Sequence, residues 1–158
     1  MKEAEDTRGG TQENPAFSID VEVSAGDIDV LGHANNVAYL KWVQAVAVAH
    51  SEAVGLAFER YREIGGVFVV SRHEIDYLRS ALRGEKLLVC TWIPIAMAAK
   101  VVRKTEVRRG TGEVVVRAHT VWGFIDIARQ RPVRIPDVVR EAFGMPRPPR
   151  KGAPAVDE

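Results

Sequence analysis

The residues best suited to chemistry gather in one short segment, DIDVLGHANN, at positions 27–36. Two acids, Asp27 and Asp29, and one histidine, His33, stand there directly before an apolar run that is typical of a helix. The free backbone N–H groups in the first turn of a helix carry partial positive charge, so they can hold an oxyanion or polarise a carbonyl. A carboxylate within reach of that carbonyl can attack it or deprotonate a water. Together they would make a hydrolytic site without a metal or a Ser-His-Asp triad.

Each of these positions also has a purely structural interpretation. The two acids could simply cap the turn, and the histidine could simply stabilise it. Gly32 could be present only because the backbone needs a positive φ angle. Asn35 and Asn36 are ordinary N-cap residues. Residue types and spacing alone leave both interpretations open.

The composition is that of one soluble globular domain. The chain has 158 residues, of which 46% are hydrophobic and 27% charged. Because the formal net charge is only +1, no excess of Lys and Arg is left to neutralise a phosphate backbone, and we expect no nucleic-acid partner. The single cysteine, Cys90, cannot form an intrachain disulfide, which suits a reducing compartment.

The sequence carries no targeting or membrane signal. The N-terminal residues 1–15 are polar and lack the apolar core and cleavage site of a secretory signal. The longest apolar stretch, within Val37–Ala49, is interrupted by Lys41 and Gln44 and is too short to cross a bilayer. We therefore expect a cytoplasmic protein with no membrane partner.

The chain divides into one folded domain and two tails. Residues 1–15 are expected to be a disordered N-terminal tail, residues 16–144 the domain, and residues 145–158 a Pro-rich C-terminal tail. The domain begins with an alternating run from Phe17 to Val23, the period-2 pattern of a half-buried strand. A helix from Val37 to Gly55 follows, apolar on nearly every face.

Four strand-like runs rich in Val, Ile, Thr, Trp and Phe come next, at 67–79, 86–95, 100–109 and 113–127. A short helix from Pro136 to Phe143 closes the domain, with Gly144 just past its end. Successive strands joined by short turns pair antiparallel, and a curved sheet wrapped around the central helix would bury its apolar surface. One such sheet covers only part of the helix and leaves free edges, so we expect a homodimer at least.

The run DIDVLGHANNVAYLKW resembles the signature of the 4-hydroxybenzoyl-CoA thioesterase-like family, D-x-D-x-x-G-H-x-N-N-x-x-Y-x-x-W, at every fixed position. The segments SRHEIDYLRSALRGE, TWIP, RAHTVWGFID and RQRPVRIPDVV continue the resemblance, which covers about residues 17–144. It implies an α+β hot-dog fold, with a five-stranded antiparallel sheet around one long central helix and a short C-terminal helix. The chain departs from the family at Ser80, where Pro is common, and at Glu85, where Asp is common.

The resemblance also implies roles for individual residues. Asp29 would be the catalytic carboxylate, as nucleophile or general base, in the hydrolysis of an acyl-CoA thioester to a free acid and CoA without a cofactor. The residues that would bind the substrate or the oxyanion are Gly32, His33 and Asn36, and those that would support the loop are Asp27 and Asn35. An acyl carrier protein could replace CoA. The assembly would be at least a homodimer, and the family further implies a homotetramer.

Other candidate residues carry weaker signals. Cys90 lies within a strand and is better explained as a small buried hydrophobe than as a nucleophile. The histidines outside the motif lack metal-like spacing, so we expect no metal site. His73 could line the pocket. A basic cluster on residues 100–109 is explained by a solvated sheet edge or by binding of the CoA phosphates, for which Arg103 is the best candidate because the family often has Arg there.

Two other functions remain open. A hot-dog protein can bind an acyl thioester without hydrolysing it, although Asp29 argues against this. A hot-dog hydratase or dehydratase would need a histidine acting with an acid, which His33 and Asp29 could imitate. Release of free thiol would distinguish hydrolysis from both.

Overall fold

The computed structural model describes residues 9–11, 15–146 and 148. Most of the two expected tails lies outside these residues. The elements along the chain are β1 (Phe17–Glu22), the 3-10 turn η1 (Ala25–Asp27), α1 (Asn36–Ala53), α2 (Phe58–Ile64), β2 (Gly66–Tyr77), β3 (Lys86–Ala96), β4 (Lys100–Arg109), β5 (Val114–Asp126), β6 (Arg131–Pro132) and α3 (Asp137–Phe143).

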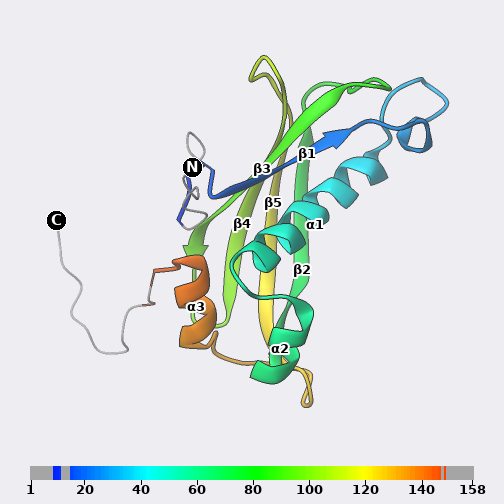
Figure 1. Cartoon of the computed structure of the whole chain (residues 1–158). Coiled ribbons are helices and arrows are strands. Elements are labelled where there is room, and N and C mark those ends of the chain that lie inside the picture. The colour runs from blue at the N-terminus through cyan, green and yellow to red at the C-terminus, as the bar shows by residue number, and fades with distance from the viewer. Residues whose placement is uncertain (1–8, 12–14, 147, 149–158) are drawn as a thin grey trace.

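Five long strands form one antiparallel sheet in the order β1-β3-β4-β5-β2. The two-residue strand β6 pairs with the end of β5. Figure 1 shows α1 lying across one face of this curved sheet, with α2 and α3 beyond the C-terminal end of α1. The expected hot-dog architecture is therefore confirmed.

Helix α1 begins and ends where its capping residues predict. The side-chain oxygen of Asn35 accepts the N–H of Ala38 at 2.8 Å, which is an N-cap, and Gly55 just beyond the helix has φ 86°. The face toward the sheet is buried and consists of Ala38, Tyr39, Trp42, Val43, Val46, Ala47 and His50. On the opposite face Val37 and Val48 are 59% and 54% exposed. One copy of the chain thus covers only one side of this apolar helix.

Sequence reasoning did not identify α2. Its seven residues span about two turns, too few for helical periodicity to stand out between α1 and β2. The helix buries Tyr61 and ends at Gly65, whose φ is 85°. Its Tyr61 belongs to an apolar cluster that also contains Leu56 and Phe124.

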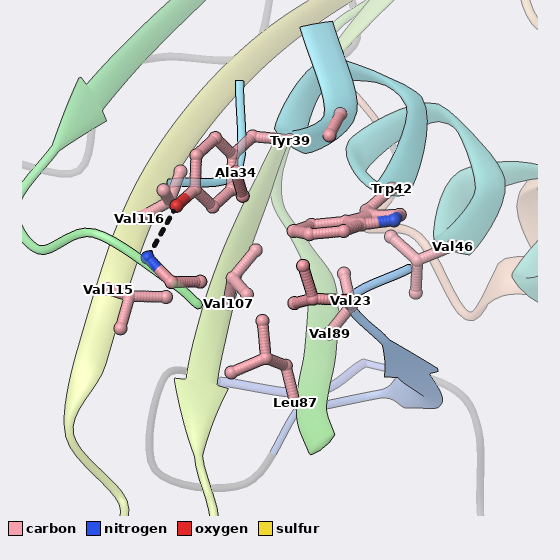
Figure 2. Close-up of a cluster of buried hydrophobic side chains, with 12 residues drawn as sticks. Val23, Ala34, Tyr39, Trp42, Val46, Leu87, Val89, Val107, Val115 and Val116 are labelled. Atoms are coloured by element: carbon pink, nitrogen blue, oxygen red, sulfur yellow. Dashed lines mark hydrogen bonds between the residues drawn. The ribbon is translucent and has the colours of Figure 1, made fainter. Parts of the chain in front are cut away.

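The core has two apolar clusters, one toward each end of α1. The first packs Tyr39, Trp42 and Val46 of α1 against valines of the sheet (Figure 2). The second joins α2 and α3 to the ends of β4 and β5, and it includes Phe143 and Met145. Met145, which we expected in the C-terminal tail, is 8% exposed there.

Buried polar side chains, His50, Thr91, Arg103, Thr105 and Thr120, also lie in the interior. Across the part of the chain that the structure describes, no helix is long and apolar enough to span a membrane.

Candidate active site

The segment between η1 and α1 folds into a tight hairpin. Ile28 and Ala34 form an antiparallel bridge, and the N–H of Asp29 donates to the carbonyl of His33 at 2.9 Å. At the tip, the N–H of Gly32 donates to the carbonyl of Asp29 at 3.1 Å. Gly32 has φ 81°, a conformation that side chains disfavour, so the turn itself requires a glycine. The hairpin holds Asp29 beside the residues that lead into α1.

The two carboxylate oxygens of Asp29 have different surroundings. Oδ1 accepts the backbone N–H of Leu31 at 2.8 Å and, more weakly, that of His33 at 3.4 Å. Oδ2 has no hydrogen-bond partner among the described residues. The side chain is only partly buried. One oxygen therefore fixes the carboxylate in the turn, and the other is available to a substrate or a water.

Asp27 ties the start of the loop to the start of the helix. Its Oδ2 accepts both the backbone N–H and the hydroxyl of Ser24, each at 2.9 Å. Its carbonyl accepts the N–H of Asn35 at 2.7 Å. These contacts occupy Asp27 with the fold of the loop.

The first turn of α1 offers free donors next to the hairpin. The N–H groups of Asn36 and Val37 donate to no acceptor among the described residues, because the side chain of Asn35 caps Ala38 instead. Asn36 is exposed and His33 is partly buried. A carboxylate oxygen and polarised N–H groups thus lie at one exposed end of the helix, the combination that acyl hydrolysis requires.

The loop between β2 and β3 supports this end of the helix. Ala34 donates its N–H to the carbonyl of Ala81 at 2.9 Å, and the N–H of Ala81 donates to the hydroxyl of Tyr39 at 2.9 Å (Figure 2). Burial raises the pKa of Tyr39 above its ordinary value. Sequence reasoning found Tyr39 only as a motif position; a buried tyrosine hydroxyl needs a partner, but its identity depends on the fold.

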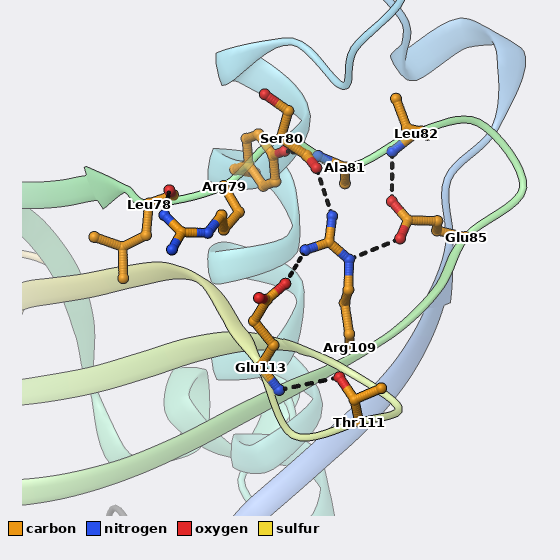
Figure 3. Close-up of polar contacts among 10 residues, drawn as sticks. Leu78, Arg79, Ser80, Ala81, Leu82, Glu85, Arg109, Thr111 and Glu113 are labelled. Atoms are coloured by element: carbon orange, nitrogen blue, oxygen red, sulfur yellow. Dashed lines mark hydrogen bonds and ion pairs between the residues drawn. The ribbon is translucent and has the colours of Figure 1, made fainter.

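Arg109, at the end of β4, also stabilises the loop between β2 and β3. Its Nη2 donates to the carbonyl of Ser80 at 2.6 Å and its Nε to Oε1 of Glu85 at 2.8 Å (Figure 3). The other oxygen of Glu85 accepts the N–H of Leu82 at 2.6 Å. Arg109 also forms an ion pair with Glu113. These bonds, chiefly that from Arg109, hold the pKa of Glu85 below its ordinary value of 4.5.

Exposed apolar side chains surround the candidate site. Val30 and Leu31 at the hairpin tip are 101% and 76% exposed, and Val37 in the first turn is 59% exposed. Exposed apolar side chains at the hairpin tip and in the first turn of α1 are unfavourable in water, and they are typical of a surface that a ligand or another chain covers.

Arg103 lies far from a solvated edge. Strand β4 pairs with β3 on one side and β5 on the other, so the sheet-edge interpretation of the basic cluster is wrong. Arg103 points to the inner face and is 4% exposed, whereas its neighbours Lys104 and Arg108 are only partly buried. Arg103 is thus poorly placed to meet phosphates that approach from solvent.

The contacts and burial of the remaining candidates, His73 and Cys90, favour structural roles. Nδ1 of His73 and Oγ1 of Thr120 lie 2.9 Å apart, and burial lowers the pKa of His73. Cys90 is buried, and burial raises the pKa of its thiol, which disfavours the thiolate. In the described part of the chain, no three His, Cys, Asp or Glu side chains gather as a metal site would need.

Comparisons with known proteins agree with this architecture. A family model described as the thioesterase-like superfamily matches residues 23–143. A provisionally named oleoyl thioesterase from Lactobacillus plantarum has a TM-score of 0.79 and 19% identity; the match covers 90% of this chain and only 57% of that protein.

Two further structures match over almost their whole length. A 1,4-dihydroxy-2-naphthoyl-CoA thioesterase from Synechocystis has a TM-score of 0.74 and 19% identity, covering 81% of this chain and 95% of that one. A thioesterase from Thermus thermophilus, in complex with coenzyme A and Zn, has a TM-score of 0.72 and 25% identity, covering 82% and 98%.

Proposed function

Because this chain belongs to the thioesterase-like superfamily and is a thioester hydrolase, we propose that it hydrolyses an acyl-CoA to a free acid and CoA, with Asp29 as the reacting carboxylate. The observation that carries the proposal is the hairpin of residues 28–34. It sets a carboxylate oxygen without a hydrogen-bond partner among the described residues beside the first turn of α1, whose N–H groups at Asn36 and Val37 are likewise unpaired there.

The chemistry follows from these two groups. The thioester carbonyl oxygen accepts the N–H of Asn36, which stabilises the negative charge that develops on it. As general base, Asp29 takes a proton from water while the water oxygen bonds to the carbonyl carbon. The C–S bond then breaks, and the departing thiolate takes that proton, so the products are the acid and CoA. As nucleophile, Asp29 would instead bond to the carbonyl carbon, and the C–S bond would break to release the CoA thiolate and leave a mixed anhydride. Water would then open the anhydride, which releases the acid and restores the Asp29 carboxylate.

The residues around Asp29 support it. Gly32 and His33 line the hairpin next to the substrate carbonyl, while Asp27 and Asn35 keep the loop joined to the helix. For the CoA phosphates, partly exposed cations such as Lys104 are better suited than the buried Arg103.

We also propose that the working enzyme is a homodimer or homotetramer. Strand β2, twelve residues long, ends the sheet and leaves one row of backbone groups unpaired within the chain. Val48 on the outer face of α1 and Phe58 at the start of α2 are 54% and 61% exposed. A second copy would cover this apolar surface and pair the edge.

The deciding experiment is a screen of the purified protein against acyl-CoAs with aromatic, short aliphatic and long-chain acyl groups, with release of free thiol as the signal. The matching acyl-pantetheine and acyl carrier protein thioesters test which carrier is used. Thiol release from at least one thioester supports hydrolysis. Binding of a thioester with no thiol release would favour the non-catalytic alternative, and a change in enoyl absorbance without thiol release would favour a hydratase.

A further inference from the structure

A cavity of about 190 Å³ lies beside the C-terminal half of α1. Its walls come from all three helices and from strands β2 to β5, and most are apolar, including Phe58, Phe68 and Phe143. The distance along α1 from Asn36 to Ser51 is about 22 Å at 1.5 Å per residue. The cavity is therefore remote from the Asp29 hairpin of the same chain.

Arg103 brings a positive charge to the wall of this cavity. Its side chain is nearly fully buried, and its Nη1 donates to Nδ1 of His50 at 3.0 Å and to Oγ1 of Thr91 at 3.1 Å. Because a guanidinium only donates, Nδ1 of His50 must accept and carries no proton. Both partners are therefore neutral at these atoms. Burial lowers the pKa of Arg103 to about 10, which still leaves a cation at neutral pH.

The charge of Arg103 lacks an anion within the described residues. No carboxylate there lies within ion-pair distance of it, and its Nε and Nη2 donate to no described acceptor. Glu52 also lines the cavity, but it is exposed and is not paired with Arg103. A buried cation without a counter-charge is costly, because it has lost its hydration. Its two neutral hydrogen bonds and the ring of Phe143, whose centroid lies 5.8 Å from Cζ of Arg103, offset only part of that cost.

Trp122 supplies a second unsatisfied donor on the same wall. Its Nε1 is buried and has no hydrogen-bond partner among the described residues. Native proteins satisfy nearly all buried donors, so an unpaired one calls for a ligand or a water. Arg103 and Trp122 thus both line the cavity, and each has a donor without an acceptor among the described residues.

We propose that this cavity binds a carboxylate carried on a compact apolar body, with the carboxylate on Arg103 and Trp122 and the body among the aromatic side chains. Arg is suited to a carboxylate because its N–H groups match both oxygens. A dry apolar cavity of about 150 Å³ takes a benzene ring, so this one suits a ring or a chain of similar size with its carboxylate. Such a ligand has two sources. One is a free acid, the product class of thioester hydrolysis. The other is the distal carboxylate of an acyl group held at Asp29 of a second copy, a source that rests on the proposed function.

The test is calorimetric titration of the full-length protein with benzoate and hexanoate and with their neutral analogues, benzamide and hexanamide. We expect each acid to bind at least tenfold more tightly than its amide. Arg103→Met should weaken binding of the acids by about 10- to 100-fold, the range for a lost bond to a charged group, and should leave the amides little changed. Trp122→Phe should weaken acid binding by a few-fold. The matched control for these titrations is Lys104→Met, which removes the neighbouring cation on the opposite face of the sheet and should leave the affinities for the free acids and the amides unchanged.

Arg103→Met replaces a charge that has no counter-ion by an apolar side chain of similar length, so we expect it to fold. If Arg103→Met does not fold, the ratio of acid to amide affinity in the unmodified protein and the effect of Trp122→Phe on acid binding still test the carboxylate site. Equal affinity for acids and amides, or acid binding that neither variant weakens, would overturn the proposal.

Hydrolysis of adipoyl-CoA compared with hexanoyl-CoA separates the two sources, because the acyl chains are equally long. A preference for adipoyl-CoA that Arg103→Met abolishes identifies the distal carboxylate of a substrate. Equal turnover together with binding of the free acids identifies a product or regulatory acid. Tight acid binding without release of thiol from any acyl-CoA would sink the proposed hydrolysis and leave the carboxylate site standing.

Discussion

The hydroxyl of Tyr39, in the first turns of α1, accepts the backbone N–H of Ala81 at 2.9 Å across a sequence separation of 42 residues. Ala81 is fully buried, and its carbonyl accepts the N–H of Ala34 at the base of the Asp29 hairpin. The tyrosine therefore connects the helix, the hairpin and the loop between β2 and β3. The loop does no chemistry, but it fixes the hairpin that holds Asp29.

Tyr39→Phe should lower both the stability of the protein and its turnover. Loss of the hydroxyl leaves the buried N–H of Ala81 without an acceptor, which costs about 1–3 kcal/mol in the free energy of unfolding. The looser hairpin should lower kcat by up to about tenfold, because positioning is sensitive to small shifts. Denaturant unfolding and thiol release measure the two effects. Tyr77→Phe, which removes a hydroxyl from a side chain 45% exposed, is the control and should do neither.

Glu85 makes the stability of the loop depend on pH. Its folded-state pKa is depressed below 4.5 by Arg109 and by the N–H of Leu82, so its contribution is fully present above the unfolded value and is lost as the pH falls through the folded value. Glu85→Gln should lower the free energy of unfolding at pH 7 by about 0.5–1.5 kcal/mol, a modest loss because both side chains are about a quarter exposed.

The difference between wild type and Glu85→Gln should shrink as the pH falls below 4.5 and vanish below the folded-state pKa. Urea denaturation between pH 7 and pH 2 measures it. Glu113→Gln removes another partner of Arg109 that is more exposed and holds no loop N–H, so its effect should be smaller. A constant difference over the whole pH range would show that Glu85 acts by packing and not by charge.

Local signals in the sequence were enough for the five long strands, for α1 and α3, and for the position of the acidic loop directly before α1, but not for α2. Asn35 and Gly55 mark the two ends of α1, and the period-2 pattern of β1 ends within one residue of the expected place. The carboxylate and the helix donors are neighbours along the chain, so their proximity follows from local structure.

Contacts between distant segments could not be predicted in this way. Neither the bond from Ala81 to Tyr39 nor the network of Arg109 has a local signal, because each depends on how the sheet folds back. Arg103 shows the same limit. A run of cations on one strand alternates between two faces, and only the strand order shows that the inner face is buried under α1.

The protein should associate in solution. Light scattering at micromolar concentration should give at least twice the 17.4 kDa of one chain, because the free edge of β2 and the exposed face of α1 gain from being covered. Dilution that dissociates the assembly should lower specific activity, since Val30 and Leu31 beside the site would lose the surface that covers them. A folded monomer with full activity would contradict this.

The most direct prediction concerns the charge of Asp29. Asp29→Asn keeps an oxygen that can accept the N–H of Leu31 and so preserves the hairpin, but it removes the negative charge. If this carboxylate is the nucleophile or general base, kcat should fall by on the order of 10²–10⁴-fold with a smaller change in KM. Asp27→Asn is the matched control.

The carboxylate of Asp27 accepts hydrogen bonds from Ser24, and an amide oxygen can still accept from that serine. Asp27→Asn should therefore lose far less turnover than Asp29→Asn. Thermal unfolding of both variants should stay close to wild type, because neither change removes a buried contact. Wild-type turnover by a folded Asp29→Asn variant would rule out the mechanism. A larger loss at Asp27 would assign the chemistry to the acid that precedes the hairpin, which the surroundings of the two carboxylates argue against.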